Sequence, residues 1–166
     1  MSTFEEFRRR HESEGATPEG ALQLWFEAAF HYFGDDEGRR AAGRQALQYL
    51  TLPYMERADW DRSSPASTFV TQLRKQPHLL RSYLKGSAPG NSYQADTERC
   101  ELNVVRSQED KQGRGWAVSL QSSGADMPRP VYLKRSTKTN LWFVDNHANV
   151  YVGIRPPESP DQEKFV

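Results

Sequence analysis

The segment that most constrains the fold of this chain is residues 129–145. Two β-like runs, 129–135 and 141–145, flank a short polar turn. Successive side chains of a strand point to opposite faces, so Val131 and Leu133 would share one face of the first strand, and Leu141 and Phe143 one face of the second. A turn this short joins antiparallel neighbours, since parallel strands need a long crossover. We therefore predict a β-hairpin here and a further strand over residues 149–154.

Helical patterning dominates the chain before residue 86. Residues 17–19 (Thr-Pro-Glu) combine a capping hydroxyl, a proline at the first helical position and an acid in the first turn, which favours a helix start. The only polar line of the helix that follows runs through Gln23, Glu27 and His31, so we expect this helix to be central. Glu27 and His31 are one turn apart and can pair on its surface. Helices are expected at residues 3–13, from 17 to about 33 and from 35 or 36 to about 50. A further helix is expected to start at residues 64–65 and to carry Phe69, Val70 and Leu73, and a short one to start at 76–77.

The cluster of helix breakers at residues 85–92 separates the helical pattern from a β pattern. After it, residues 99–106 and 116–121 add strand patterns to the hairpin, and the second of these alternates cleanly. The expected fold class is therefore α+β, with N-terminal helices packed on one face of a curved antiparallel sheet that the C-terminal half forms.

We expect a single α+β domain over residues 1–154, with a helical part over 1–85 and a β part over 92–154. Residues 155–166 contain three prolines and many charges, which predicts an extended, flexible tail.

Composition argues against several classes of partner and cofactor. The 22 basic and 22 acidic residues balance, so no nucleic-acid partner is expected. No apolar run approaches the roughly 20 residues of a membrane span, and no signal-peptide pattern opens the chain, so we expect a cytoplasmic protein without a membrane partner. We interpret the single cysteine, Cys100, as a small buried hydrophobe. Metal-ligand and nucleotide-binding motifs do not occur in the sequence, so neither a metal nor a cofactor is expected.

The polar corner after the hairpin, residues 145–147 (Asp-Asn-His), is the most catalytic-looking cluster. A carboxylate beside an imidazole could supply a general base and the group that orients it. The same residues are typical of a turn between two strands. In a strand, Asp145 and His147 share a face only if the chain stays extended. We favour the turn, with catalysis and metal ligation as the alternatives.

The order of elements resembles a known family. After N-terminal helices, residues 130–135 (Pro-Val-Tyr-Leu-Lys-Arg) lead by a tight turn into residues 141–145 (Leu-Trp-Phe-Val-Asp), which is similar to the nuclear transport factor 2-like (SnoaL-like) cone fold. The resemblance implies a cavity between the concave sheet face and the helices, where enzymes of this fold use Asp–His and Asp–Tyr pairs to abstract protons. It also makes four large aromatic residues candidates for the ligand-binding lining of that cavity, although they also fit a buried core: Trp25, Tyr32, Trp116 and Trp142.

Two main functions fit these observations. We favour a non-catalytic binding or protein-interaction domain, because aromatic residues are plentiful and acid–base residues are sparse. Its partner would be a protein or a small apolar ligand, and a homodimer could form through the open face of the sheet. The alternative is a small acid–base enzyme of the isomerase or dehydratase type that uses Asp145 or His147 with Tyr32. A third possibility is an interaction through the tail that ends at residues 164–166 (Lys-Phe-Val).

Overall fold

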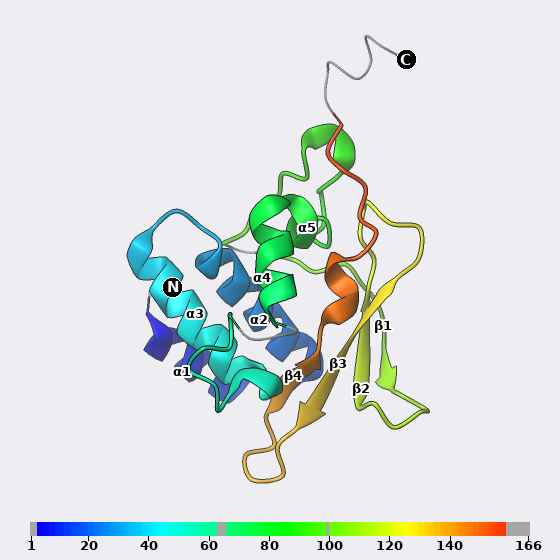
Figure 1. Ribbon diagram of the computed structural model, residues 1–166. Coiled ribbons are helices and arrows are strands. Elements are labelled where there is room, and N and C mark those ends of the chain that lie inside the picture. The colour runs from blue at the N-terminus through cyan, green and yellow to red at the C-terminus, as the bar shows by residue number, and fades with distance from the viewer. Residues whose placement is uncertain (1–2, 63–65, 99, 159–166) are drawn as a thin grey trace.

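The computed structural model describes residues 3–62, 66–98 and 100–158 (Figure 1). In this described part, the helices come first: α1 Phe4–Glu14, α2 Pro18–Tyr32, α3 Glu37–Leu50, α4 Ala66–Lys75 and α5 His78–Arg81. The strands follow: β1 Val104–Glu109, β2 Trp116–Leu120, β3 Arg129–Arg135 and β4 Trp142–Asn146. Short 3-10 helices are η1 Leu52–Tyr54, η2 Pro89–Asn91 and η3 Ala148–Tyr151.

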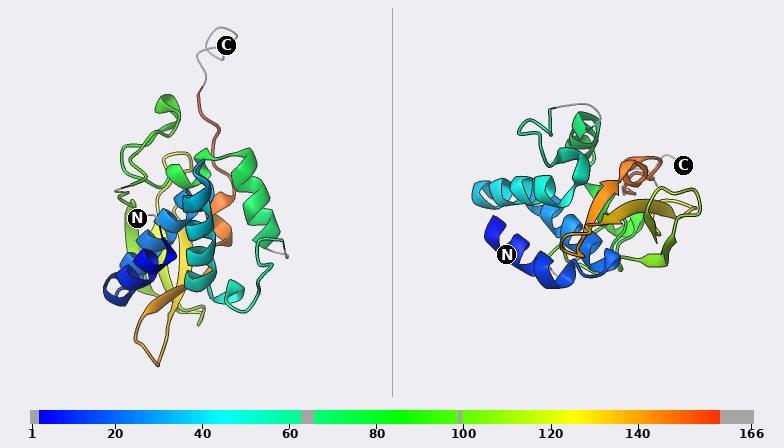
Figure 2. Two further views of the ribbon diagram at one scale, coloured as in Figure 1. Left: turned by 90° about the vertical axis from the view of Figure 1, so that its left-hand side faces the viewer. Right: turned by 90° about the horizontal axis from the view of Figure 1, so that it is seen from below.

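The α+β fold class predicted from the sequence is confirmed. The strands pair antiparallel in the order β1-β2-β3-β4, and the sheet is open. Figure 1 shows the helices gathered on one side of the sheet, and in the views of Figure 2 helices α1 and α3 stay on that side. Helix α2 packs against α1 and α3 as well as against β2 and β4, so it is the central helix.

Helix α2 begins where its capping signals predict. The hydroxyl of Thr17 accepts a hydrogen bond from the N–H of Gly20 at 3.0 Å. The prediction that Glu27 and His31 pair on the surface is wrong, because both side chains are buried. Helix α1 covers this side of α2, and Arg10 forms a 2.9 Å ion pair with Glu27. His31 Nδ1 donates to the backbone carbonyl of Glu27 (2.9 Å), not to its carboxylate.

The first residue of β4, Trp142, is fixed against the helical half of the molecule. Its N–H donates to the carbonyl of Gly15, and its own carbonyl accepts from Nε2 of the buried His11, both at 2.8 Å. His11 Nδ1 accepts a hydrogen bond from the Tyr49 hydroxyl, also at 2.8 Å. A Cβ at Gly15 would lie 2.4 Å from the His11 ring, so only glycine fits there without displacing the imidazole.

The strand predicted over residues 149–154 is wrong, because the chain forms η3 there instead of a fifth strand. The side-chain oxygen of Asn146 accepts a hydrogen bond from the N–H of Ala148 (3.0 Å), which starts a turn directly after β4. Val150 is buried in the core, and its carbonyl accepts a hydrogen bond from the Tyr83 hydroxyl at 2.6 Å. The apolar spacing that suggested a strand therefore reflects burial against the helices.

Strand β1 begins at Val104, later than the predicted start near residue 99. The residues before it pair with the segment after α5 through an isolated bridge between Leu84 and Leu102. This pairing joins the helical half to the sheet.

The predicted tail is described only over residues 155–158, and these residues are hydrogen-bonded to the domain. The N–H of Arg155 donates to the carbonyl of Gly124, and the N–H of Glu158 to that of Pro89, both at 2.9 Å. The helix start expected at residues 64–65 and the chain end at 164–166 lie outside the described residues.

Candidate functional site

Trp116 and Trp142, two of the aromatic residues expected to line a cavity, meet at one end of the sheet. They begin β2 and β4, the strands on either side of β3. In the sheet register, Trp116 lies opposite Leu133 and Trp142 lies opposite Arg135. Because side chains alternate along β3, all four side chains start from one face. The two indoles pack edge to face, with ring centroids 5.7 Å apart.

Hydrogen bonds hold the indole of Trp116 and the main chain of Trp142. The indole N–H of Trp116 donates to the hydroxyl of Ser107 on β1 at 2.7 Å. Gly115 just before it has a φ of 108°, and a Cβ there would lie 2.5 Å from the carbonyl oxygen of Leu133. The main chain of Trp142 is held by its two hydrogen bonds to the helical half. The pair is therefore positioned by the fold itself.

These side chains border an open groove of about 500 Å³, which we call the tryptophan groove. Both indoles are half-buried, so part of each faces the groove. Apolar walls with a few polar groups at the rim are typical of ligand-binding sites. The residues that line the groove are Glu109, Gly115, Trp116, Leu133, Lys134, Arg135, Thr137 and Trp142.

Among the charged side chains of the groove, Lys134 has a partner of opposite charge, whereas Arg135 and Glu109 have none among the described residues. The guanidinium carbon of Arg135 lies 5.9 Å from the centroid of the Trp142 ring. Asp145 on the neighbouring strand pairs with Lys134 at 3.4 Å, and within the described residues no carboxylate lies in ion-pair reach of Arg135. Glu109 likewise has no cationic partner in that part of the chain. The groove therefore has an unneutralised cation beside β4 and an unneutralised anion on β1.

The second candidate cluster surrounds His147, just beyond the other end of β4. The ring is buried, and its Nε2 shares a hydrogen bond with the Tyr54 hydroxyl. Its centroid lies 5.0 Å from that of Trp25 and 4.6 Å from that of Phe69. Burial lowers the pKa of His147 to about 4, so the imidazole is neutral at pH 7.

Asp145 and His147 line one open pocket of about 410 Å³, together with Tyr54 and Tyr151. The carboxylate of Asp145 is half-buried and pairs with Lys134. Among the described hydrogen bonds, none joins this carboxylate to His147. The orienting hydrogen bond of a carboxylate–imidazole base is therefore not formed between these two groups.

Tyr32 and Trp25 lie away from the tryptophan groove. The Tyr32 hydroxyl donates to Asp61 at 2.7 Å, and the residue lines a separate cavity of about 640 Å³ between α2, α3 and the end of α4. Burial and this hydrogen bond raise the pKa of Tyr32 to about 12. Trp25 is fully buried, and its indole N–H donates to the Thr51 hydroxyl at 2.9 Å. The structure therefore brings together only two of the four aromatic candidates.

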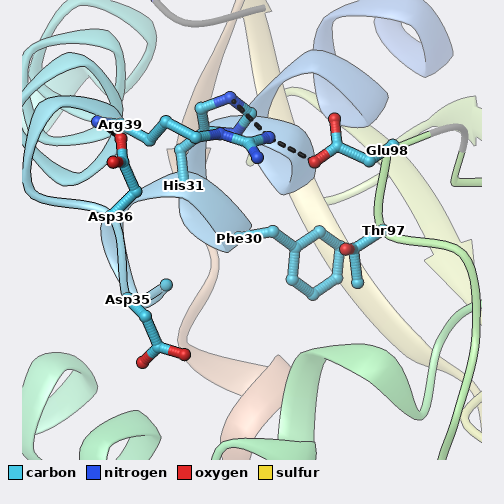
Figure 3. Close-up of a pocket in the computed structure, with 8 residues that line it drawn as sticks. Phe30, His31, Asp35, Asp36, Arg39, Thr97 and Glu98 are labelled. Carbon is cyan, nitrogen blue, oxygen red and sulfur yellow. Dashed lines mark hydrogen bonds and ion pairs between the residues drawn. The ribbon is translucent and has the colours of Figure 1, made fainter.

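A third cluster, which the sequence reasoning missed, surrounds Arg39 (Figure 3). Its guanidinium donates to Nε2 of the buried His31 at 3.2 Å and pairs with Glu98, which precedes β1. Nε2 is placed to accept this bond, since Nδ1 is the ring nitrogen that bonds to the Glu27 carbonyl. The cavity here is only about 160 Å³, with Asp35 and Thr97 also in its lining. Because Arg39 is engaged on both sides, we interpret this cluster as a cross-link between the helices and the segment before β1.

The described residues also bear on metal binding, membrane insertion and thiol chemistry. No three His, Cys, Asp or Glu side chains among them gather as metal ligands, and none of their helices is both long and apolar enough to cross a membrane. Cys100 is buried, as expected for a small hydrophobe. Burial raises the pKa of its thiol to about 12, so it is protonated at neutral pH.

Comparison with known proteins gives one match. A family described as Domain of unknown function (DUF6935) matches residues 2–158. No curated protein and no solved structure matches the chain.

Proposed function

We propose a function on the geometry of the site alone. The chain belongs to the DUF6935 family, and the description of that family assigns no activity. The proposed function is non-catalytic binding, with the ligand in the tryptophan groove. The observation that carries it is the contact of Trp116 with Trp142 in an open groove of about 500 Å³. This volume lies within the range of roughly 300–1,000 Å³ of small-molecule sites.

The two indoles suit the recognition of an apolar or aromatic group. A ligand that covers them removes apolar surface from water, which is favourable by about 25 cal/mol per Å². An aromatic ring that packs on an indole adds about 0.5–1.5 kcal/mol. Since hydrogen bonds already hold both residues in place, little conformational entropy is lost on binding.

The groups expected to act in acid–base catalysis are bonded to other side chains, and this favours a non-catalytic role. His147 is bonded to Tyr54, and its low pKa makes it a weak base. Asp145 pairs with Lys134, and Tyr32 donates to an aspartate in another cavity. An isomerase or dehydratase at residues 145–147 stays the alternative hypothesis, and it would require Asp145 to exchange Lys134 for His147.

A fluorescence titration with the neutral aromatic compound N-phenyl-1-naphthylamine tests the proposal. We expect the wild-type protein to bind it, and Trp142→Ala or Trp116→Ala to weaken binding about tenfold or more, since each removes an aromatic contact. Tyr32→Phe, in a different cavity, is the matched control and should bind like the wild type. Unchanged affinity in both tryptophan variants, or no binding by the wild type, would overturn the proposal.

A homodimer through the open sheet face stays a prediction, as does a protein partner. On that face Arg114 covers the ring of Tyr132, with its guanidinium carbon 4.8 Å from the ring centroid, and Lys134 is exposed. Both cations already pair with carboxylates of the same chain, Arg114 with Asp110 and Lys134 with Asp145, so the dimer should depend little on salt. Light scattering at micromolar concentration measures this, and a monomeric mass at both low and high salt counts against the dimer.

A further inference from the structure

We infer that the ligand of the tryptophan groove is an amphipathic anion, an apolar or aromatic molecule with one carboxylate or sulfonate that pairs with Arg135. This inference rests on the proposed function and adds the chemical class of the ligand. It depends on the charges around the groove, whereas the proposed function depends on the two indoles.

The first support is the position and pairing of Arg135. It lies opposite Trp142 at the end of β3, and its guanidinium lies over that indole. The acid on the neighbouring strand, Asp145, pairs with Lys134, and Asp110, just after β1, pairs with Arg114 at 2.9 Å. A guanidinium beside an apolar wall, with donors to spare, is suited to bind a planar anion through two parallel hydrogen bonds.

The second support is that the groove carries opposite charges at its two sides. Glu109 lies opposite Trp116 on β1, and Arg135 lies two residues beyond Leu133 on β3. With strands about 4.8 Å apart and about 3.4 Å between residues, the main-chain positions of the two charges are roughly 12 Å apart. Trp116 on β2 lies between them, and Trp142 lies on the far side of Arg135, on β4. An anionic group is therefore favoured at the Arg135 side, and the apolar part of the ligand lies over the two indoles.

Two dyes with the same aromatic frame test the inference. 8-Anilino-1-naphthalenesulfonate carries a sulfonate, and N-phenyl-1-naphthylamine lacks it. In Arg135→Gln we expect the sulfonate dye to bind about five- to tenfold more weakly, while the neutral dye changes less than twofold. Arg135→Lys keeps the charge and should recover part of the affinity. Added salt should weaken only the sulfonate dye in the wild type.

Glu109→Gln is the matched control, because it removes the opposite charge from the same groove. It should strengthen binding of the sulfonate dye about twofold and leave the neutral dye unchanged. Both exposed positions tolerate these changes, so unfolding midpoints should match the wild type and exclude loss of fold as the cause.

The outcomes separate the two claims. If the tryptophan variants weaken both dyes but Arg135→Gln affects both dyes alike or neither, the inference about the anion is overturned and the proposed function stands. If the tryptophan variants leave both dyes unchanged, or if the wild type binds neither, the proposed function fails and the inference fails with it.

Discussion

The two ends of β4 carry aromatic clusters of similar composition but opposite character. At its start, Trp142 and Trp116 are half-buried, and the cation over Trp142 has no carboxylate partner among the described residues. Beyond its other end, His147 is enclosed by Trp25 and Phe69 and bonded to a tyrosine hydroxyl. Aromatic rings beside a polar residue therefore do not by themselves indicate a site. What distinguishes the first cluster is exposure together with an unneutralised charge.

The largest expected effect is a difference in the free energy of unfolding that is lost when one tryptophan of each cluster is replaced by alanine. Trp25→Ala should lower the free energy of unfolding by about 3–5 kcal/mol, because it leaves a large cavity in the core. Trp142→Ala should cost only about 1–2 kcal/mol, because part of the indole is already in water. Urea unfolding measures both. Equal losses would mean that the groove is part of the core and would remove the contrast.

The next effect is a pH dependence of stability that His147 contributes. The pKa of His147 is about 4 in the fold against about 6.5 when unfolded, so the unfolded state binds the proton first as the pH falls. Its contribution to stability is present above pH 6.5 and is lost toward pH 4, by up to about 3 kcal/mol at 1.4 kcal/mol per pKa unit.

Burial also lowers the pKa of His11 and, with the nearby Arg81 charge, that of His78. Comparison of His147→Gln with the wild type therefore isolates the contribution of His147 to the pH dependence of stability. The variant should lose less stability than the wild type between pH 7 and pH 4.5 in urea titrations. An identical loss in the two proteins would show that His147 does not titrate as described.

A smaller loss of stability is expected at Gly15, which packs against the His11 ring that holds Trp142. Gly15→Ala forces a methyl group against the His11 ring, which should cost about 1–3 kcal/mol and displace Trp142. Gly38→Ala is the control, because only the Asp36 carboxylate lies near its added Cβ and alanine favours a helix. Thermal unfolding of the pair should show a loss only at Gly15, and equal behaviour would argue against a fixed Trp142.

The smallest effect on stability is expected at Arg135. Its guanidinium is exposed and has no described ion pair, so Arg135→Gln should change the free energy of unfolding by less than about 0.5 kcal/mol. A larger loss would show that Arg135 serves the fold rather than a ligand.

The sequence predicted those parts of the fold that local signals determine. The cap at Thr17 and the strand over residues 116–120 depend on neighbours in the chain, and both appear in the structure. The predicted alternation is not clean, because Ala117 is buried as well as Val118 and Leu120. The segment 149–154 has similar apolar spacing but forms η3, because its burial is set by distant partners such as Tyr83. Periodicity alone does not separate these cases.

The candidate site was predictable in part. Trp116 and Trp142 were recognised as candidate lining residues, but their contact depends on the register of β2, β3 and β4. The role of His11 was missed, although a signal existed: it follows Phe7 by four residues and so lies on the buried stripe of α1. That Arg135 has no carboxylate partner among the described residues cannot be deduced from sequence, because it depends on where every nearby carboxylate lies.

The most direct test of the central claim uses the indole N–H signals of the four tryptophans in a ¹H–¹⁵N NMR spectrum, assigned with Trp→Phe variants. On titration with 8-anilino-1-naphthalenesulfonate, the signals of Trp116 and Trp142 should shift together, while those of the fully buried Trp25 and Trp60 stay in place. Shifts confined to Trp25 or Trp60, with Trp116 and Trp142 unmoved, would contradict a binding site in the tryptophan groove.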